Sequence, residues 1–300
     1  MVPHAPRFVC VGSISYDFIF QVNRLPKEHE KLRCPSVTQG TGGSAANAAF
    51  WLARLGCDVQ LVASIGADAW GQLCTQQLSA AGVKTDFLQI YPDLATGVAT
   101  VFTNPTDKRM VTASGANQNL DMQRFDYSEI APNTHIHLSL ANEEKALALL
   151  HQAKRQGAST SCEFNGISSL ERIKLCDYCF MNHDELGRWL GYENPVVAWR
   201  KLAAGSDAAL IVTCGGNGAT LIRGHEEFHV AAAQTNVVDR TGGGDAFDAG
   251  FLAGVMGGLD VTASLSVGLE LAAQVISFAG ATNQHPMNSV ERLYQRRNPQ

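Results

Sequence analysis

The chain has 300 residues, 45% of them hydrophobic, and a formal net charge of −5 at pH 7. A chain of this length can bury a large core in a single domain, here taken as residues 1–300. Its negative charge argues against nucleic acids or anionic membrane surfaces as main partners. No apolar run reaches the length of a membrane span, and the N-terminus has no signal-peptide pattern. Eight scattered cysteines are typical of free thiols, so we expect a cytoplasmic protein.

Strand and helix patterns alternate along most of the chain. Strands are predicted near 7–13, 58–64, 134–139, 158–163, 177–181 and 208–213. Helices are predicted near 44–56, 69–82, 143–156, 184–190, 195–204, 245–257 and 262–279. This alternation predicts an α/β fold with a largely parallel sheet covered by helices. Segments 15–39 and 86–113 break the rhythm, since they are strand-like with few helical signals.

The first strand and the first helix carry polar residues that could hold a ligand. Asp17, two residues after Ser15, could accept hydrogen bonds from two neighbouring hydroxyls, although a solvated loop aspartate is the simpler interpretation. Gly42 and Gly43 open the helix at 44–56 and would let a ligand approach the backbone closely. Asn47, one turn into that helix, offers a donor and an acceptor. Tight packing by small residues is the competing explanation.

A second glycine turn, Gly242, Gly243 and Gly244, precedes Asp245 between a strand pattern and the helix at 245–257. Backbone N–H groups in such a turn can close around an anion, and the helix dipole adds positive potential. A carboxylate there is chemically sensible as a base that takes a proton from an attacking hydroxyl. An ordinary helix N-cap is the alternative.

Five segments, in this order, resemble the ribokinase family, the PfkB-type carbohydrate kinases. Gly12–Asp17 resembles the family's first sugar-contacting strand, and Gly42, Gly43 and Asn47 resemble its N-terminal signature. Asn182 and Glu185 resemble the family's Asn-x-x-Glu motif, which helps to hold magnesium and phosphate. Thr213, Gly215 and Gly218 resemble its nucleotide-binding Thr-x-Gly-x-x-Gly turn. Thr241–Asp245 resembles the C-terminal signature with its anion hole and catalytic base.

The resemblance implies a ribokinase-like three-layer fold in which 15–39 and 86–113 form a small β-sheet lid that excludes water. It implies ATP-dependent phosphorylation of a sugar hydroxyl with Mg²⁺, and a homodimer formed through the lid. Asp245 would act as the base, the N–H groups of the three glycines would stabilise the γ-phosphoryl charge, and Asp17, Gly43 and Asn47 would position the acceptor. Asp239 and Thr241 keep positions that help to ligate a monovalent cation, possible K⁺ ligands in this chain.

Departures from the ribokinase pattern concern the substrate. Ser15 stands where Asn is usual and Ser44 where Lys is usual, and no glutamate stands at Ala141. These changes put simple ribose in doubt. Glu163, in the stretch 162–165, could be a variant of the Asp-x-Asn motif of related sugar kinases or only a solvated strand end.

Two rival functions stay open. A nucleoside kinase is possible because Tyr16, Phe18 and Phe20 alternate along a strand and could stack a base, although core or dimer packing competes. A sugar- or nucleotide-binding protein without catalysis is the second rival, and Asp245 argues against it. No G-x-G-x-x-G follows the first strand, which disfavours a Rossmann dehydrogenase. Cys176 and Cys179 form a lone C-x-x-C, for which zinc is not expected.

Overall fold

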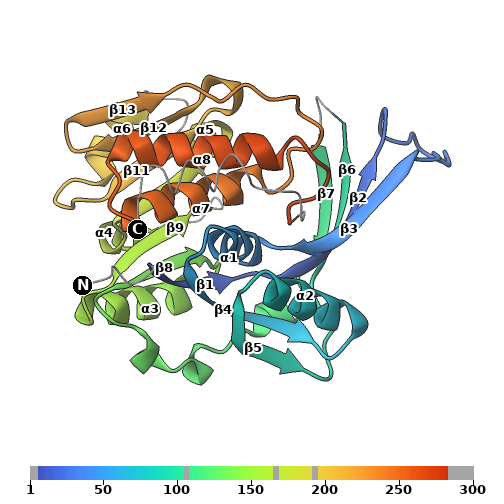
Figure 1. Cartoon of the computed structure of the whole chain (residues 1–300), viewed down its shortest axis with the longest axis horizontal. Coiled ribbons are helices and arrows are strands. Elements are labelled where there is room, and N and C mark those ends of the chain that lie inside the picture. Colours follow the sequence, from blue (N-terminus) through green and yellow to red (C-terminus); the bar gives the residue numbers. More distant parts are fainter. Residues whose placement is uncertain (1–5, 105–107, 165–168, 191–194, 283–300) are drawn as a thin grey trace.

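The computed structural model describes residues 6–104, 108–164, 169–190 and 195–282. Its main body is a nine-stranded sheet (Figure 1). The strands, in spatial order, are β13 (Glu226–Val230), β12 (Ala219–Arg223), β11 (Ala209–Thr213), β10 (Tyr178–Asn182), β9 (Ser159–Glu163), β8 (Thr134–Ser139), β1 (Arg7–Gly12), β4 (Asp58–Gly66) and β5 (Lys84–Tyr91). β12 pairs antiparallel with β11 and β13, and the other neighbouring strands pair in parallel. The predicted, largely parallel α/β sheet is confirmed.

Helices cover both faces of this sheet, as the alternation of side chains along its strands requires. On β1, Phe8 and Cys10 belong to the core that includes α1 (Ser44–Arg54), α2 (Ala69–Ala80), α7 (Gly243–Met256) and α8 (Val261–Val275). Val9 and Val11 belong to the opposite core, which includes α3 (Glu143–Arg155), α4 (Leu170–Leu175), α5 (His183–Leu190) and α6 (Pro195–Leu202). The result is the three-layer arrangement expected from the sequence.

A separate four-stranded sheet stands at one end of the molecule (Figure 1). Its order is β3 (Ser36–Gly42), β2 (Ser15–Gln21), β6 (Val98–Thr103) and β7 (Lys108–Ala113), and only β2 and β6 pair in parallel. Residues 86–91 were assigned to this lid from the sequence, but they belong to β5 and pair with β4. A half-exposed edge strand has the same residue pattern in either sheet, so only the tertiary pairing decides its place.

Connections differ from the sequence analysis at a few points. The helix expected at 262–279 ends at Val275, and the hairpin of β12 and β13 was not foreseen as a pair. All eight cysteines are free thiols, and six of them are buried. None of the helices in the described ranges is both long and apolar enough to cross a membrane.

Candidate active site

A cavity of about 480 Å³ lies between the small sheet and the carboxyl ends of the large-sheet strands. Parallel α/β sheets commonly bind ligands at this edge. The cavity is lined by most of the residues singled out from the sequence: Ser15, Asp17, Gly43, Asn47, Glu163, Asn182, Glu185, Thr213, Thr241, Gly242, Gly244 and Asp245. Gly42, Gly215, Gly218, Asp239 and Gly243 do not line it.

Asp245 lies in the first turn of α7 at the centre of this site. Its Oδ2 accepts a hydrogen bond of 2.6 Å from Asn47 Nδ2. Burial, followed by the nearby charge of Glu163, raises the pKa of Asp245 from 3.8 to about 7, against opposing contributions from Asn47, Lys108 and Ser44. A carboxyl group that titrates near neutrality is suited to accept a proton from an alcohol.

The turn before Asp245 takes a shape that requires glycine. Gly242 has a φ of 76°, and a Cβ on it would lie 2.5 Å from the Cβ of Ala281. The first N–H groups of a helix have no partner within the helix. Gly243 N–H already donates to the Arg240 carbonyl at 3.4 Å, whereas Gly244 is exposed towards the cavity. Of the three glycines proposed to bind the phosphoryl group, Gly244 is the best placed.

The opposite wall is built from β2, the turn at Gly43 and the start of α1. Asp17 is buried, and its Oδ1 accepts a 2.6 Å hydrogen bond from Ser15 Oγ. Burial raises the pKa of Asp17, and the Ser15 hydrogen bond partly opposes this. A Cβ on Gly42 would lie only 2.0 Å from Asp17 Oδ2, and Gly43 has a φ of 92°. The lack of a side chain at both positions therefore allows the close packing of this wall.

Asn47 supplies a further indication of a ligand. Its Nδ2 is held by Asp245, but its buried Oδ1 has no hydrogen-bond partner among the described residues. An unsatisfied buried acceptor is costly, so a donor from outside the chain, such as a hydroxyl, would stabilise the site.

The Asn-x-x-Glu motif forms a reciprocal cap at the start of α5. Asn182 N–H donates to Glu185 Oε2 at 3.0 Å, and Glu185 N–H donates to Asn182 Oδ1 at 2.8 Å. This is the geometry of a capping box. Burial raises the pKa of Glu185, and the hydrogen bond from the backbone of Asn182 partly lowers it again. Both residues line the cavity, and their side-chain oxygens are hard donors of the kind that Mg²⁺ prefers.

The remaining motif residues support loops. Gly215 and Gly218 have φ of 54° and 89° in the turn after Thr213. Thr241 donates to Asp239 Oδ1 through N–H and Oγ1, at 3.0 and 2.8 Å, and Gly280 N–H donates to Asp239 Oδ2 at 3.0 Å. Both carboxylate oxygens of Asp239 are thus bound to the backbone of two loops. A monovalent cation at Asp239 and Thr241 stays a prediction.

The whole-chain comparison decides the family. Residues 5–288 match the model of the pfkB family carbohydrate kinases. The chain belongs to this family. It is a carbohydrate kinase, a phosphotransferase, as expected from its motifs.

Individual relatives cover almost the same length. The chain is similar to the deoxyribokinase of Salmonella typhimurium, with 28% identity over 289 residues, 92% of this chain and 94% of the relative. It is also similar to the nucleoside kinase of Methanocaldococcus jannaschii, with 26% identity over 97% of this chain and 98% of the relative. The structure of Arabidopsis thaliana ribokinase in complex with ribose and ATP superposes with a TM-score of 0.84, at 26% identity over 97% of this chain and 99% of that one.

Several residues of this pfkB kinase site were not found from the sequence. Lys108, Met110 and Thr112 line the cavity at alternate positions of β7, so a strand period of two was the available signal. Lys108 lowers the pKa of both Asp17 and Asp245 through its charge, against the larger effect of burial. Ala141 and Glu143 do not line the cavity, whereas Ser15, Ser44 and Glu163 do. Lys108 and Glu163 therefore bring charge to a pocket that Ser15 and Ser44 alone had suggested to be less charged.

Proposed function

We propose that this chain transfers the γ-phosphoryl group of ATP to a hydroxyl of a sugar or sugar derivative, with Asp245 as the general base. The observation that carries the proposal is the carboxyl group of Asp245, which has a pKa of about 7 and lies at the cavity beside the N-terminus of α7. A base at this place could take the proton from an acceptor hydroxyl as the oxygen attacks phosphorus.

The acceptor and the phosphoryl group would be held from opposite sides of Asp245. Asp17 and the free Oδ1 of Asn47 can accept hydrogen bonds from sugar hydroxyls. The N–H group of Gly244 and the α7 dipole favour negative charge on the phosphoryl group. Because the transition state of phosphoryl transfer is loose, such positioning and charge stabilisation supply most of the catalysis.

Magnesium would be held on the side of Asn182 and Glu185. Their carbonyl and carboxylate oxygens at the cavity fit an ion that binds hard oxygen donors and keeps several waters. The chemistry that Mg²⁺ supplies when bound is neutralisation of charge on the ATP phosphates. Potassium at Asp239 and Thr241 would act on the anion-binding turn only indirectly, through the loop.

A sugar is favoured over a nucleoside as acceptor because the aromatic residues that could stack a base are already engaged. Tyr16 stacks on Trp70 with ring centroids 4.5 Å apart, and Phe20 stacks on Phe102 at 5.6 Å. None of these rings lines the cavity, and neither does Phe18, which packs edge-on against Trp70. The first of the two rival functions therefore loses the feature that suggested it.

A homodimer formed through the small sheet is part of the proposal. Val111 on β7 and Val37 on β3 are 70% and 48% exposed, although each lies on an edge strand of that sheet. Exposed apolar edge strands invite pairing with a second copy. Light scattering of the purified chain would measure its mass, and a strict monomer would contradict this part.

The direct test is a phosphorylation screen over pentoses, hexoses, sugar acids and nucleosides with MgATP, read as ADP release and as phosphorylated product. We expect at least one sugar or sugar derivative to be phosphorylated. Binding of ATP and sugar without product in every reaction would support the non-catalytic rival, and a clear preference for nucleosides would support the nucleoside kinase.

A further inference from the structure

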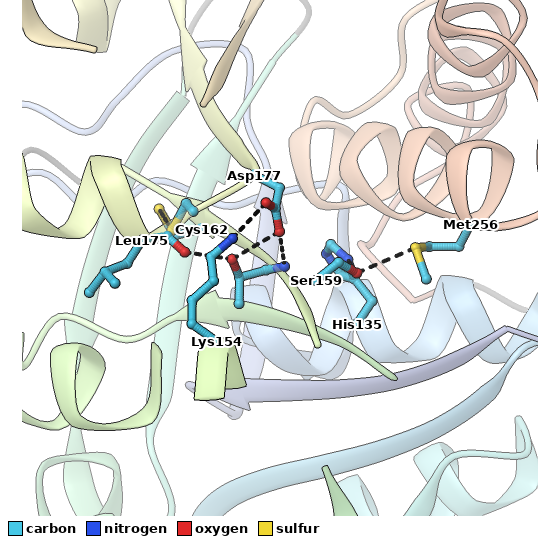
Figure 2. Close-up of polar contacts among 9 residues, drawn as sticks. His135, Lys154, Ser159, Cys162, Leu175, Asp177 and Met256 are labelled. Carbon is cyan, nitrogen blue, oxygen red and sulfur yellow. Dashed lines mark hydrogen bonds and ion pairs between the residues drawn. The ribbon is translucent and has the colours of Figure 1, made fainter. Parts of the chain in front are cut away.

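A buried row of polar side chains joins β8 to β9 on the face of the large sheet that α7 covers. His135 Nδ1 lies 2.7 Å from Ser159 Oγ, and His135 Nε2 lies 2.7 Å from Ser161 Oγ. Ser161 Oγ lies in turn 2.8 Å from His137 Nδ1. At the far end of the row, Ser159 Oγ donates to Met256 Sδ of α7 at 3.5 Å (Figure 2).

The methionine sets the direction of the protons along this row. A thioether can only accept, so the single hydroxyl proton of Ser159 points to Met256 and His135 Nδ1–H donates to Ser159. Burial disfavours a charged His135 ring, so His135 Nε2 accepts the proton of Ser161. Ser161 Oγ then accepts from His137 Nδ1–H. The second ring nitrogen of His137, Nε2, lies at the other end of the row.

This nitrogen lies beside the carboxyl groups of Glu163 and Asp248. His137 is fully buried, and its Nε2 has no hydrogen-bond partner among the described residues. It lies 3.4 Å from Glu163 Oε1, and one donor atom each of His137, Glu163 and Asp248 lie within 4.8 Å of one another. Glu163 Oε1 also accepts from Ser139 Oγ at 3.0 Å, which fixes one side of this cluster of three donor groups.

We propose that His137, Glu163 and Asp248 bind a divalent transition-metal ion of the Mn²⁺ or Zn²⁺ type at the floor of the cavity. One imidazole nitrogen and two carboxylates suit these ions, whereas Mg²⁺ and Ca²⁺ prefer oxygen donors alone. The Nδ1–H of His137 donates to Ser161, as metal-binding histidines commonly donate their second nitrogen to a neighbouring acceptor. Small side-chain rotations would bring the three donors to one ion.

The ion has a route into this site. Glu163 and Asp248 both line the cavity, so an ion can reach them through the cavity without any rearrangement of the hydrophobic core. The donors come from β8, β9 and α7, and none of them belongs to the Asn182 and Glu185 pair proposed to hold magnesium. This site therefore goes beyond the proposed phosphotransfer and can be tested without it.

The test is titration of the nucleotide-free full chain with Mn²⁺, in which the electron paramagnetic resonance signal of free Mn²⁺ reports binding. We expect one Mn²⁺ per chain that a large excess of Mg²⁺ does not displace. Asp248→Asn keeps the side-chain shape and His137→Gln removes the nitrogen donor, and each should weaken binding at least about tenfold. Ser161→Ala, which removes the acceptor of His137 Nδ1–H, should weaken it about 10- to 100-fold.

Glu171→Gln, which removes an exposed carboxylate of α4 outside both metal sites, is the control and should leave Mn²⁺ affinity unchanged. Glu185→Gln tests whether the Mn²⁺ binds instead at the pair proposed to hold magnesium. Circular dichroism and thermal unfolding show which variants are folded, and Asp248→Asn decides the question if His137→Gln does not fold. The proposal is overturned if the wild-type chain binds no Mn²⁺, if Mg²⁺ displaces it readily, or if Glu185→Gln abolishes binding that Asp248→Asn retains. The titration contains neither nucleotide nor sugar, so its outcome does not depend on kinase activity.

Discussion

Replacing Glu163 by Gln should change the pH at which the enzyme becomes active. Burial is the largest cause of the raised pKa of Asp245, and the charge of Glu163 is the second. In an assay freed of transition-metal ions, so that no cation offsets the charge of Glu163, the variant keeps the burial and loses the negative neighbour, which favours the ionised form of Asp245. A neighbouring opposite charge moves a carboxyl pKa by about 1–3 units, and a like charge acts in the other direction. We expect a fall of about one unit because Glu163 is the smaller cause.

This shift can be measured without comparing absolute rates. The base must be ionised to act, so kcat/KM should rise with pH through the pKa of Asp245. With a pKa near 7 the ratio of kcat/KM at pH 6 to that at pH 8 is about one-tenth, and with a pKa near 6 it is about one-half. We therefore expect the Glu163→Gln ratio to rise about fivefold.

The ratio is insensitive to an equal loss of acceptor binding at both pH values. Glu171→Gln, which removes an exposed carboxylate from α4, is the control and should keep the wild-type ratio. An unchanged ratio in Glu163→Gln, or an acid limb moved to higher pH, would refute the assignment of Glu163 as a charge that acts on Asp245.

Three further results are expected. Gly43→Ala should destabilise the fold by more than about 1–3 kcal/mol, because a strained φ is combined with a Cβ only 2.6 Å from the Ser13 carbonyl oxygen. Gly56→Ala, with a φ of 85° and open space around it, is the control. Equal losses of unfolding free energy in the two variants, measured by urea unfolding, would contradict the clash. Potassium should raise activity above sodium at equal ionic strength if Asp239 and Thr241 hold an ion, and identical rates would mean that no such site operates. Ribose should be outrun in kcat/KM by a larger acceptor, because Ser15 and Ser44 are short polar groups at the cavity; a wide preference for ribose would show this inference to be wrong.

Local signals explain what could be predicted from the sequence. Gly43 and Gly242 are fixed by backbone shapes that other residues cannot adopt, so their turns were visible before the structure. The alternation of strand and helix patterns predicted a largely parallel sheet covered by helices. Asn47 and Asp245 are 198 positions apart in the sequence, and only the family resemblance brought them into one site before the fold did.

Long-range packing explains what was missed. β5 was assigned to the lid because an edge strand has no pattern that names its partner. Lys108 reaches the site only through the pairing of β6 and β7, and Asp248 only because α7 packs beside β9.

The central claim is that Asp245 removes the proton of the acceptor hydroxyl. Its most direct test is the turnover of Asp245→Asn with the best acceptor from the screen, alongside Asp86→Asn, the same change at an exposed position of β5. We expect kcat to fall by roughly 10²–10⁴-fold in Asp245→Asn, with a much smaller change in KM, and to stay unchanged in the control. Near-normal turnover in a correctly folded Asp245→Asn variant would contradict the account.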